Sequence, residues 1–504
     1  MPADPSANEK RPRHFWRNAT WLVPALLGAL VFLPTLWGSA IYDDRLVFED
    51  ERLRDVSAWG RFWSEPYHPG PDNLYRPLGS MSFAVVWWVF GDAWWPQHAV
   101  NVLLHAACSA LVAVFAGRLT RRPTAAIIAG IAFALHPVHV EAIAMLVGRF
   151  ELLCTGATLA GLALLVTDRA ISIPRALAVT ACFAVALLSK EQGLLFPVLA
   201  GVTVLATRGF VKPGIGAAVL LANLGLGLVA LVIAREHFLE LKFWWSRGFL
   251  DPNIQPLVLA EGANRWLMPV ELLGRYAGIL VWPDPLSIEY GGQIIGRETS
   301  VGEPYFLAGA AVALAWVGGC VGSAIARRWD LLALLMLAAI AYGPAANFLT
   351  LIGTIFGERL LYMPSAFLAA LLGIGVAKLP VKAWVVPGIL ALAWAGQCVR
   401  YAVRWTDPFT YYQQAVIDQP LGMRLHVLLA KEHQARGDFD AARASAAAAR
   451  DADPDSHLPW AWSAGLALER GDLDDAERFA HEANKRLPNA GKAVLLAVRE
   501  QRGE

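Results

Sequence analysis

Residues 19–44 read ATWLVPALLGALVFLPTLWGSAIYDD and carry no charge before two adjacent carboxylates, Asp43 and Asp44. A helix needs roughly 20 apolar residues to cross a hydrocarbon core of about 30 Å, so this run is long enough to span a membrane. It is also longer than the apolar core of about 7–15 residues in a secretory signal peptide, and it lacks a small-residue cleavage site. We therefore expect the run to remain in the protein as a membrane anchor.

The composition extends this interpretation to the whole chain. Of its 504 residues, 56% are hydrophobic and 17% are charged, whereas soluble domains carry about 25% charged residues. Uncharged runs recur at residues 213–234, 305–326 and 331–357. The sequence thus predicts a polytopic membrane protein, and its net charge of +1 gives no reason to expect nucleic-acid binding. The five cysteines lie in apolar segments without paired spacing, so we interpret them as core residues.

Lysines and arginines cluster in the short breaks between apolar runs, and the positive-inside rule places such breaks in the cytoplasm. This predicts about eleven transmembrane helices with the N-terminus inside. The expected spans are residues 19–41, 98–117, 123–145, 150–167, 176–189, 192–207, 214–234, 305–326, 331–352, 358–377 and 383–400. Residues 1–18 form a cytoplasmic tail in this scheme, and residues 19–402 form the membrane domain.

The same scheme predicts two large outward loops, residues 42–97 and 235–304. Each contains an apolar stretch that we do not count as a span. Residues 76–95 end in a Trp-rich segment that suits the membrane interface, and residues 266–283 carry Glu271 and Arg275 near their middle. We expect both stretches to lie along or dip into the outer surface of the membrane.

A repeat follows the last span, in residues 403–504. The segment ARGDFDAARASA at 435–446 recurs as ERGDLDDAERFA at 469–480, and Pro420, Pro454 and Pro488 keep the same interval of 34 residues. A 34-residue period with Gly-Asp between two helices and alanine at their contact is the signature of tetratricopeptide repeats. The sequence predicts about two and a half such repeats outside the membrane. They form either a groove that presents an acceptor or partner, or a structural cap.

Charged residues at membrane depth are costly, so each outward cluster is a candidate for function. Lys190 and Glu191 split one long apolar stretch into halves that are too short for a full crossing. We expect this turn to be recessed and to line a water-filled cavity; the alternative is that Lys190 and Glu191 merely neutralise each other. Arg76 leads into the first interfacial stretch and binds either a phosphate or a carboxylate of its own loop.

A second cluster, HPVHVEAIAMLVGRFE, occupies residues 136–151. His136 and His139 do not follow a zinc-protease pattern and have no evident third ligand, so we assign no metal site. We expect both imidazoles to face a polar cavity. Glu141 and Arg149 are candidates for hydrogen bonds to a sugar and a phosphate, although Arg149 could simply reach the membrane interface.

Several stretches together resemble the membrane-plus-tetratricopeptide O-mannosyltransferases (the TMTC family), within the GT-C superfamily of lipid-phosphate-sugar transferases. The resembling segments are YDD (42–44), YRPLGSMSF (75–83), NVLLHA (101–106), FALHPVHVEAIAMLVGRFELL (133–153), LLSKEQGLLFPVL (187–199), WPDPLSIEY (282–290) and GERLLYMPS (357–365). With the repeats they cover most of the chain in the expected order. The resemblance implies a GT-C-like all-α fold and a transferase that uses a polyprenyl-phosphate-linked sugar.

The resemblance also implies roles for individual residues. Asp43 and Asp44 correspond to the acidic pair that opens the first outward loop and acts as catalytic base or positions the acceptor. A hydroxyl that attacks an anomeric carbon needs a carboxylate to take its proton, and the leaving phosphate needs fixed cations. The candidate cations are Arg149, Lys190, Arg359 and Arg76. The groups expected to orient the sugar, the acceptor or these cations are His136, His139, Glu141, Glu191 and Glu358.

The sequence thus predicts an inverting transferase that moves mannose, or another hexose or pentose, to an acceptor hydroxyl on the extracytoplasmic side. The acceptor could be protein, lipid or glycan. Whether the Asp pair binds a Mg²⁺ or Mn²⁺ ion is left open by the sequence. The Ala- and Arg-rich composition suggests a bacterial inner membrane with periplasmic repeats. The alternative is a non-catalytic membrane scaffold that recruits partners of an envelope or glycan-assembly complex through its repeats. A transporter or flippase is disfavoured because the chain shows no internal symmetry.

Overall fold

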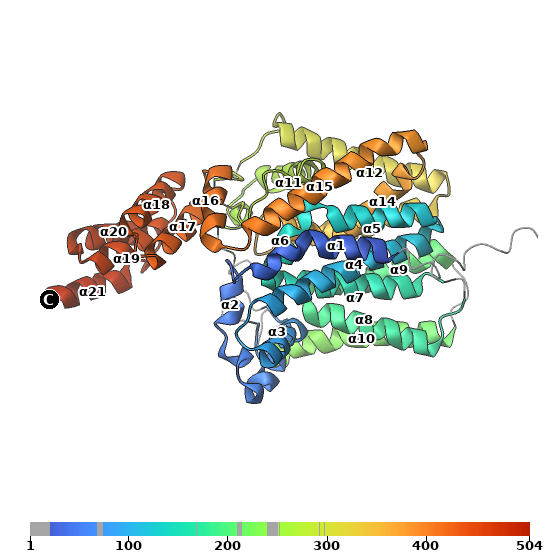
Figure 1. The fold of residues 1–504 in the computed structure, drawn as a ribbon, viewed down its shortest axis with the longest axis horizontal. Coiled ribbons are helices and arrows are strands. Elements are labelled where there is room, and N and C mark those ends of the chain that lie inside the picture. The colour runs from blue at the N-terminus through green and yellow to red at the C-terminus, as the bar shows by residue number, and fades with distance from the viewer. Residues whose placement is uncertain are drawn as a thin grey trace, which may run out of the picture. The chain divides into compact units, whose positions relative to one another are not determined.

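The computed structural model describes residues 21–67, 74–167, 169–208, 214–238, 250, 252–291, 293–296 and 298–503. Within these ranges helices are the regular secondary structure and no strand occurs, which confirms the all-α prediction (Figure 1). The predicted tail 1–18 and part of the loop 235–304 lie outside the described residues. The chain divides into two compact units. Unit 1 is Met1–Ser246, Ala311–Ala346 and Glu358–Thr406; unit 2 is Arg247–Ala310, Asn347–Gly357 and Asp407–Glu504.

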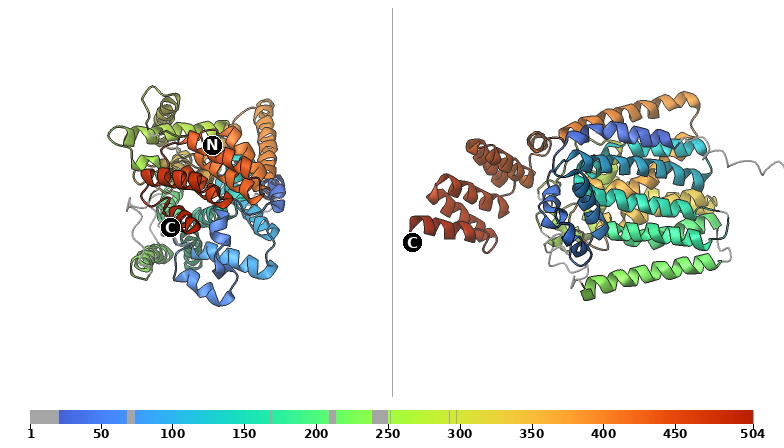
Figure 2. Two further views of the ribbon diagram at one scale, coloured as in Figure 1. Left: turned by 90° about the vertical axis from the view of Figure 1, so that its left-hand side faces the viewer. Right: turned by 60° about the horizontal axis from the view of Figure 1, so that its bottom comes forward.

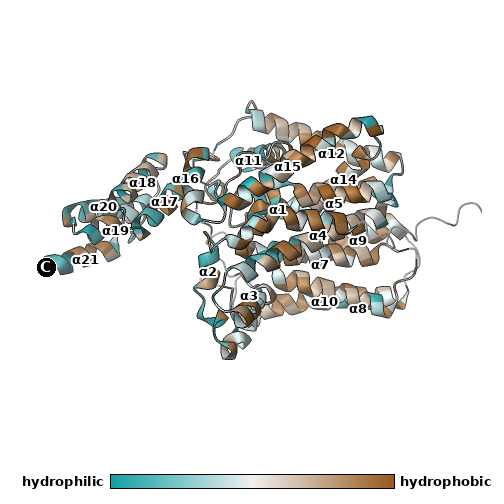
Figure 3. Ribbon diagram, in the orientation of Figure 1, coloured by the Kyte–Doolittle hydropathy of each residue, from teal (hydrophilic) through white to brown (hydrophobic). Residues whose placement is uncertain are grey.

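The long helices of unit 1 lie side by side in a bundle (Figures 1 and 2). They are α1 (Leu22–Phe32), α4 (Trp95–Thr120), α5 (Pro123–Leu135), α7 (Arg149–Leu165), α8 (Ile173–Ser189), α9 (Phe196–Arg208), α10 (Ile215–Ile233), α13 (Trp329–Tyr342), α14 (Tyr362–Val376) and α15 (Val385–Arg404). Helices α4, α5 and α14 pack against one another at the centre. Outer helices are apolar on their exposed faces (Figure 3); Leu221 of α10 and Leu392 of α15 are 69% and 75% exposed. Such a surface fits lipid rather than water.

Seven helices of the described part are long and apolar enough to cross a membrane, or eight if one bent pair counts as a span. The chain is thus a multi-pass membrane protein, while the predicted number of eleven is not confirmed. Three of the predicted spans fall short because they correspond to the shorter helices Leu22–Trp37, Ile173–Ser189 and Glu191–Thr207. A fourth, residues 123–145, is bent by 54° between Pro123–Leu135 and Pro137–Ala144, where Pro137 interrupts the helix.

Short helices carry the polar motifs at breaks in the bundle. They are α2 (Asp44–Phe48), α3 (Pro77–Phe90), α6 (Val140–Ala144) and the 3₁₀ turns Pro137–His139, Leu146–Gly148, Glu191–Leu195 and Glu358–Leu361. In Figure 1, α2, α3 and α6 gather at one end of the bundle. Two glycines make the tight turns possible: a Cβ at Gly148 would lie 2.1 Å from the carbonyl oxygen of Ala142, and one at Gly193 2.5 Å from the backbone of Ala186.

Unit 2 begins with α11 (Asn264–Val281) and the N-terminal part of α12 (Pro304–Ile325). Helix α11 is not among the candidate spans of the described residues, and its central charges form an ion pair of 2.7 Å between Arg275 and Glu271. Its predicted place on the outer surface of the membrane stays a prediction. A Cβ at Gly274 would lie 1.9 Å from the carbonyl oxygen of Tyr305, so glycine allows α11 and α12 to touch.

The rest of unit 2 is a stack of antiparallel helices, drawn in red in Figure 2. They are α16 (Pro408–Asp418), α17 (Met423–Ala435), α18 (Phe439–Ala452), α19 (Leu458–Arg470), α20 (Leu473–Arg486) and α21 (Lys492–Arg502). The stack obeys the 34-residue interval. Gly437 and Gly471 both have positive φ, at 76° and 81°, which glycine adopts without strain. The buried alanines of α18 recur 34 residues later in α20; they are Ala442, Ala446, Ala449, Ala476, Ala480 and Ala483.

The first helices of this stack are anchored within their own unit. Arg424 of α17 forms an ion pair of 2.8 Å with Glu289, and the backbone N–H of Ile288 donates to the Tyr411 hydroxyl at 2.9 Å. The loop that contains WPDPLSIEY therefore supports the start of the repeats. A helical repeat is observed, and its assignment to the tetratricopeptide family stays a prediction.

Candidate functional site

The two adjacent aspartates have different surroundings. Asp44 is fully buried; one carboxylate oxygen accepts from the N–H of Ile41 at 3.1 Å and the other from the N–H of Val147 at 2.9 Å. The Asp43 side chain is 31% exposed and lies 3.5 Å from Nη1 of Arg359. Asp44 thus ties the start of the first loop to the turn before α7, while Asp43 remains accessible.

Burial changes the titration of Asp44, which lies outside the membrane-spanning segments. Loss of solvation raises the pKa of its carboxyl to about 7, and the N–H donors of Val147 and Ile41 oppose this rise only in part. Asp44 is therefore partly protonated at neutral pH. Asp43, with its exposed side chain, is the carboxylate of the pair that a substrate can reach.

Arg359 connects Asp43 to a buried carboxylate. Its Nη1 lies 3.0 Å from Oε1 of Glu141, and its backbone N–H donates to Oε2 of Glu141 at 2.7 Å. The Glu141 side chain is 2% exposed and that of Arg359 is 22% exposed. One guanidinium therefore joins the GERLLY segment, the HPVHVEA segment and the acidic pair, which the sequence separates widely.

Lys190 and Glu191 do not pair with each other in this structure. Lys190 pairs with Glu151 of α7. Glu191 accepts two hydrogen bonds from Arg76, at 3.1 Å from Nε and 2.7 Å from Nη2. The alternative in which Lys190 and Glu191 neutralise each other is thus not observed. Arg76 does bind a carboxylate, but that carboxylate is Glu191 and not a residue of its own loop.

The four ion pairs described above form one electrostatic group. Arg359 interacts with Asp43, Glu141 and Glu151, and Lys190 interacts with Glu151, Arg76 and Arg359. Apart from the buried Asp44, the group contains three cations and four carboxylates. They are Arg76, Lys190, Arg359, Asp43, Glu141, Glu151 and Glu191. The solvent-facing members are Asp43, Arg359, Arg76 and Glu191, with side chains between 14% and 31% exposed.

Arg149, predicted to bind phosphate, has other partners. It is fully buried; Nε donates to Oδ1 of Asn101 at 2.9 Å, and Nη2 donates to the carbonyl of Gln97 at 2.7 Å and to its Oε1 at 2.9 Å. Its guanidinium lies 4.1 Å from the ring centroid of Phe83. Arg149 thus ties α7 to α4 and α3, and it is a member of none of the four ion pairs.

The two predicted histidines lie behind the ion pairs. His139 is fully buried; Nδ1 donates to the carbonyl of Phe133 at 2.8 Å and Nε2 lies 2.8 Å from Oγ of Ser365. His136 accepts at Nδ1 from the N–H of Val138 and packs on Trp394, with ring centroids 4.4 Å apart. Both brace the helix break rather than face the exposed group. Glu358 is buried at the start of the turn that presents Arg359.

Two residues of this group were not predicted. Glu151, the partner of Lys190, follows Arg149 by two residues inside a quoted motif, so its charge in an apolar run was an available signal. Tyr67 is buried, with its ring 5.5 Å from the Arg76 guanidinium and 5.0 Å from the Phe150 ring. Nothing in the sequence around Tyr67 marks it.

A metal site was also considered at the Asp pair. Across the described ranges, no group of three His, Cys, Asp or Glu residues is placed to hold a metal ion. Both oxygens of Asp44 accept backbone N–H groups, and Asp43 faces a cation. The pair therefore offers no third ligand for Mg²⁺ or Mn²⁺ in this part of the chain.

Sequence comparison identifies the relatives. No protein-family model matches the chain. The protein O-mannosyl-transferase F38B6.6 of Caenorhabditis elegans is 27% identical over 448 residues, which cover 85% of this chain and 62% of that relative. Protein O-mannosyl-transferase TMTC2 of Mus musculus is 36% identical over 137 residues, or 26% of this chain and 16% of TMTC2. The chain is homologous to the TMTC protein O-mannosyl-transferases.

This finding confirms the resemblance to the TMTC family. The chain spans less than two thirds of the length of these two TMTC relatives. Among solved structures, ArnT from Cupriavidus metallidurans bound to undecaprenyl phosphate gives a TM-score of 0.43 at 15% identity, covering 98% of this chain and 78% of that chain. The GT-C-like fold therefore stays a prediction.

Proposed function

We propose that this chain is an inverting glycosyltransferase that moves a sugar from a polyprenyl-phosphate donor to an acceptor hydroxyl. The observation that carries the proposal is the accessible Asp43 beside Arg359, whose other partner is the buried Glu141. A carboxylate next to an exchangeable cation supplies both needs of the reaction, a proton acceptor and a phosphate ligand. The TMTC relatives are named O-mannosyl-transferases, and we extend sugar transfer, mannose or another sugar, to this chain.

In the proposed reaction, the acceptor oxygen attacks the anomeric carbon opposite the phosphate. The new carbon–oxygen bond forms as the bond to the phosphate oxygen breaks, and that oxygen leaves with the electron pair. The acceptor proton passes to a carboxylate oxygen of Asp43. Because this is a single displacement, the anomeric configuration inverts.

The phosphate would take Arg359 as its first cation, with Arg76 and Lys190 as the next candidates. Arg359 and Arg76 each already bind a carboxylate and are partly exposed, so an incoming phosphate competes for charge that is already in position. Glu141, Glu151 and Glu191 hold these cations in place. We assign Asp44 and Arg149 to positioning, because both are fully buried and bound to their surroundings.

The location of the reaction is part of the proposal. We place the ion-pair group on the extracytoplasmic side, with the N-terminus in the cytoplasm, because positive charges cluster in the opposite breaks. The seven candidate spans among the described residues support membrane integration. A bacterial inner membrane and tetratricopeptide repeats that hold a protein, lipid or glycan acceptor complete the proposal.

The test replaces Asp43, Asp44 and a control aspartate one at a time in the full chain. The variants are Asp43→Asn, Asp44→Asn and Asp92→Asn, the last at an exposed position between α3 and α4. Extracytoplasmic glycans and glycoproteins are compared by mass spectrometry with the wild type and a deletion strain, at matched protein levels in the membrane. We expect Asp43→Asn to remove the same sugar-sized modification as the deletion, and Asp92→Asn to retain it.

The same experiment separates the transferase from the scaffold. If the deletion loses a glycan and Asp43→Asn retains it fully, the chain acts through recruitment and the catalytic assignment is wrong. If Asp44→Asn lowers the amount of folded protein while Asp43→Asn lowers only the product, the division of roles between the two aspartates is supported. Purified protein with a polyprenyl-phosphate sugar and NMR of the product would then establish the anomeric configuration.

A further inference from the structure

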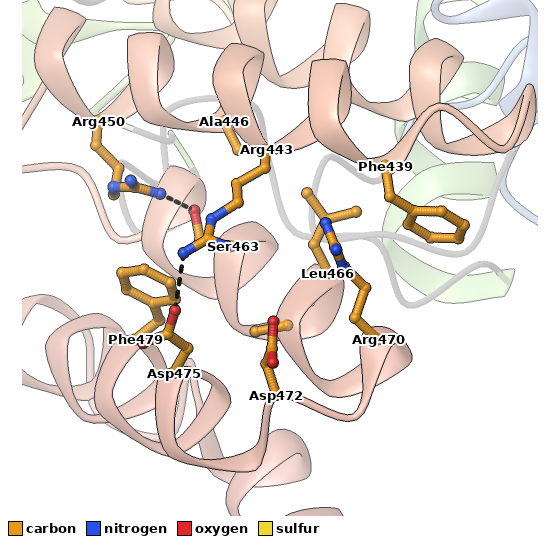
Figure 4. Close-up of a pocket in the computed structure, with 11 residues that line it drawn as sticks. Phe439, Arg443, Ala446, Arg450, Ser463, Leu466, Arg470, Asp472, Asp475 and Phe479 are labelled. Atoms are coloured by element: carbon orange, nitrogen blue, oxygen red, sulfur yellow. Dashed lines mark hydrogen bonds and ion pairs between the residues drawn. The ribbon is translucent and has the colours of Figure 1, made fainter.

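The repeat module contains a cleft outside the proposed transfer site. It lies between α18, α19 and α20, and its empty space, open solvent included, is about 350 Å³. Figure 4 shows its side chains, with Arg443 and Arg450 on α18, Ser463 and Arg470 on α19, and Asp475 and Phe479 on α20. The cleft opens to solvent, so it offers a surface for the side chains of an extended segment rather than an enclosed ligand pocket.

Positive charge is in excess at the Phe479 end of the cleft. Asp475 pairs with Arg443 at 3.0 Å and with Arg478 at 2.8 Å, and Glu482 pairs with Lys485 at 2.6 Å and with Arg486 at 2.8 Å. Arg450 makes no ion pair with any described residue. These five cations, the basic cluster, thus share Asp475 and Glu482, with Asp451 as a third carboxylate that acts on Arg450. The cluster keeps an excess of positive charge although residues 407–504 contain 12 basic and 16 acidic residues in total.

The guanidinium of Arg450 is positioned by two aromatic rings. Its guanidinium lies 4.8 Å from the ring centroid of Phe479 and 5.4 Å from that of Trp460, and Nη1 donates to the Ser463 hydroxyl. A stacked guanidinium keeps donors in its plane, which suit a carboxylate. The other members are easily rearranged, because Arg443 and Arg478 are 57% and 64% exposed and exposed pairs are weak.

We propose that the basic cluster binds an acidic, extended segment of a partner polypeptide. Arg443 and Arg450 are seven residues apart on one helix, or about 10.5 Å. In a polyproline II strand, side chains three residues apart face the same side at about 9.3 Å. Carboxylates at every third residue of such a segment therefore match the two arginines. Asp472 and the Arg470–Asp440 pair give the other end of the cleft one excess negative charge. This difference sets which end of the segment is acidic.

The proposal does not depend on sugar transfer and is tested by binding alone. The probe is a fluorescein-labelled 12-residue peptide with glutamate at every third position, compared with the same peptide carrying glutamine. The full-length protein in detergent is titrated by fluorescence anisotropy. The variants are Arg450→Ala, Arg478→Ala and the control Arg499→Ala, which removes an exposed arginine of α21 outside the cleft. Circular dichroism verifies that each variant is folded.

We expect the glutamate peptide to bind at least tenfold tighter than the glutamine peptide. Arg450→Ala and Arg478→Ala should each weaken its binding at least fivefold, and Arg499→Ala less than twofold. Since Arg478 is 64% exposed, its variant keeps the test valid if Arg450→Ala does not fold. Equal binding of both peptides, or equal binding by all three variants, overturns the proposal. Phosphatidylglycerol vesicles are a second probe. If Arg450→Ala and Arg478→Ala lose binding to these vesicles and keep unchanged binding to the glutamate peptide, the proposal is overturned in favour of a membrane surface.

Discussion

The ion pairs around Arg359 and Lys190 in unit 1 are more buried than the pair between Arg470 and Asp440 on the repeats of unit 2. In unit 1, Arg359 and Glu141 have side chains 22% and 2% exposed, and Lys190 and Glu151 are 9% and 4% exposed. In the repeats, Arg470 and Asp440 are 38% and 91% exposed. Loss of one partner of a buried pair leaves a desolvated charge behind, whereas an exposed residue is left to water. Removal of one partner by mutation is therefore expected to cost more stability in unit 1 than in the repeats.

The largest effect is expected for Arg359→Gln. It leaves the buried Glu141 without its cation, which costs about 3–5 kcal/mol of stability, and it removes the proposed phosphate ligand. We expect loss of folded protein in thermal unfolding and no detectable transfer. The double variant Arg359→Gln with Glu141→Gln should recover the stability and not the activity. Recovery of both would show that Arg359 has only a structural role.

Asp44 should make stability depend on pH. Its pKa is raised to about 7 in the folded chain and is near 3.8 when unfolded, so folding favours the protonated form. The stabilisation is complete below about pH 4 and is lost as the pH rises to about 7, up to about 4 kcal/mol in total. Unfolding in detergent between pH 5 and 8 measures this slope. Asp44→Asn should flatten it; an unchanged slope would assign it to another group.

A smaller loss is expected from Gly148→Ala. The new Cβ would lie 2.1 Å from the Ala142 carbonyl oxygen, so the turn before α7 must shift, at a cost of about 1–3 kcal/mol. The shift would also displace the Val147 N–H from Asp44. Gly60→Ala is the control, because nothing lies within 4 Å of its added Cβ. Equal melting temperatures for the two variants would contradict the described turn.

The smallest effect is expected from Arg470→Ala in the repeats. Its partner Asp440 is 91% exposed, and exposed pairs contribute about 0–1 kcal/mol. We expect a change in melting temperature near the error of measurement and no change in sugar transfer. A loss as large as that of Arg359→Gln would remove the contrast between the two units.

Features that depend on periodicity can be predicted from the sequence, and features that depend on packing cannot. The 34-residue interval alone indicates the helix boundary at Gly437 and the alanines at the helix contacts. The motifs that carry Asp43, Glu141, Lys190 and Arg359 are recognisable as polar segments at membrane depth, and the helix breaks do bring them together. Their partners were not predictable. Lys190, in an extended conformation between α8 and the turn Glu191–Leu195, pairs with Glu151 of α7, whereas the adjacent Glu191 pairs with Arg76.

Arg149 illustrates the same limit. An arginine in an apolar run is conspicuous in the sequence, yet its partners are the amides of Gln97 and Asn101 on another helix. Amides give no periodic or charge signal in the sequence. Composition therefore cannot distinguish an arginine that is bound by uncharged side chains from one that is available to a ligand. Tyr67 was missed for a related reason, since an aromatic residue in a loop of several aromatic residues carries no distinguishing pattern.

The equivalent positions in α18 and α20 also bear on how such a chain can change over generations. Each helix pair in the stack meets its neighbour through the same small alanines and ends at the same kind of glycine, Gly437 or Gly471. If 34 residues between those glycines are duplicated or deleted, the helices at the new junction again meet through the same alanine positions. This holds because each repeat contacts only its neighbours. The reach of the module can therefore lengthen or shorten by genetic recombination while the ion pairs of unit 1 are inherited unchanged.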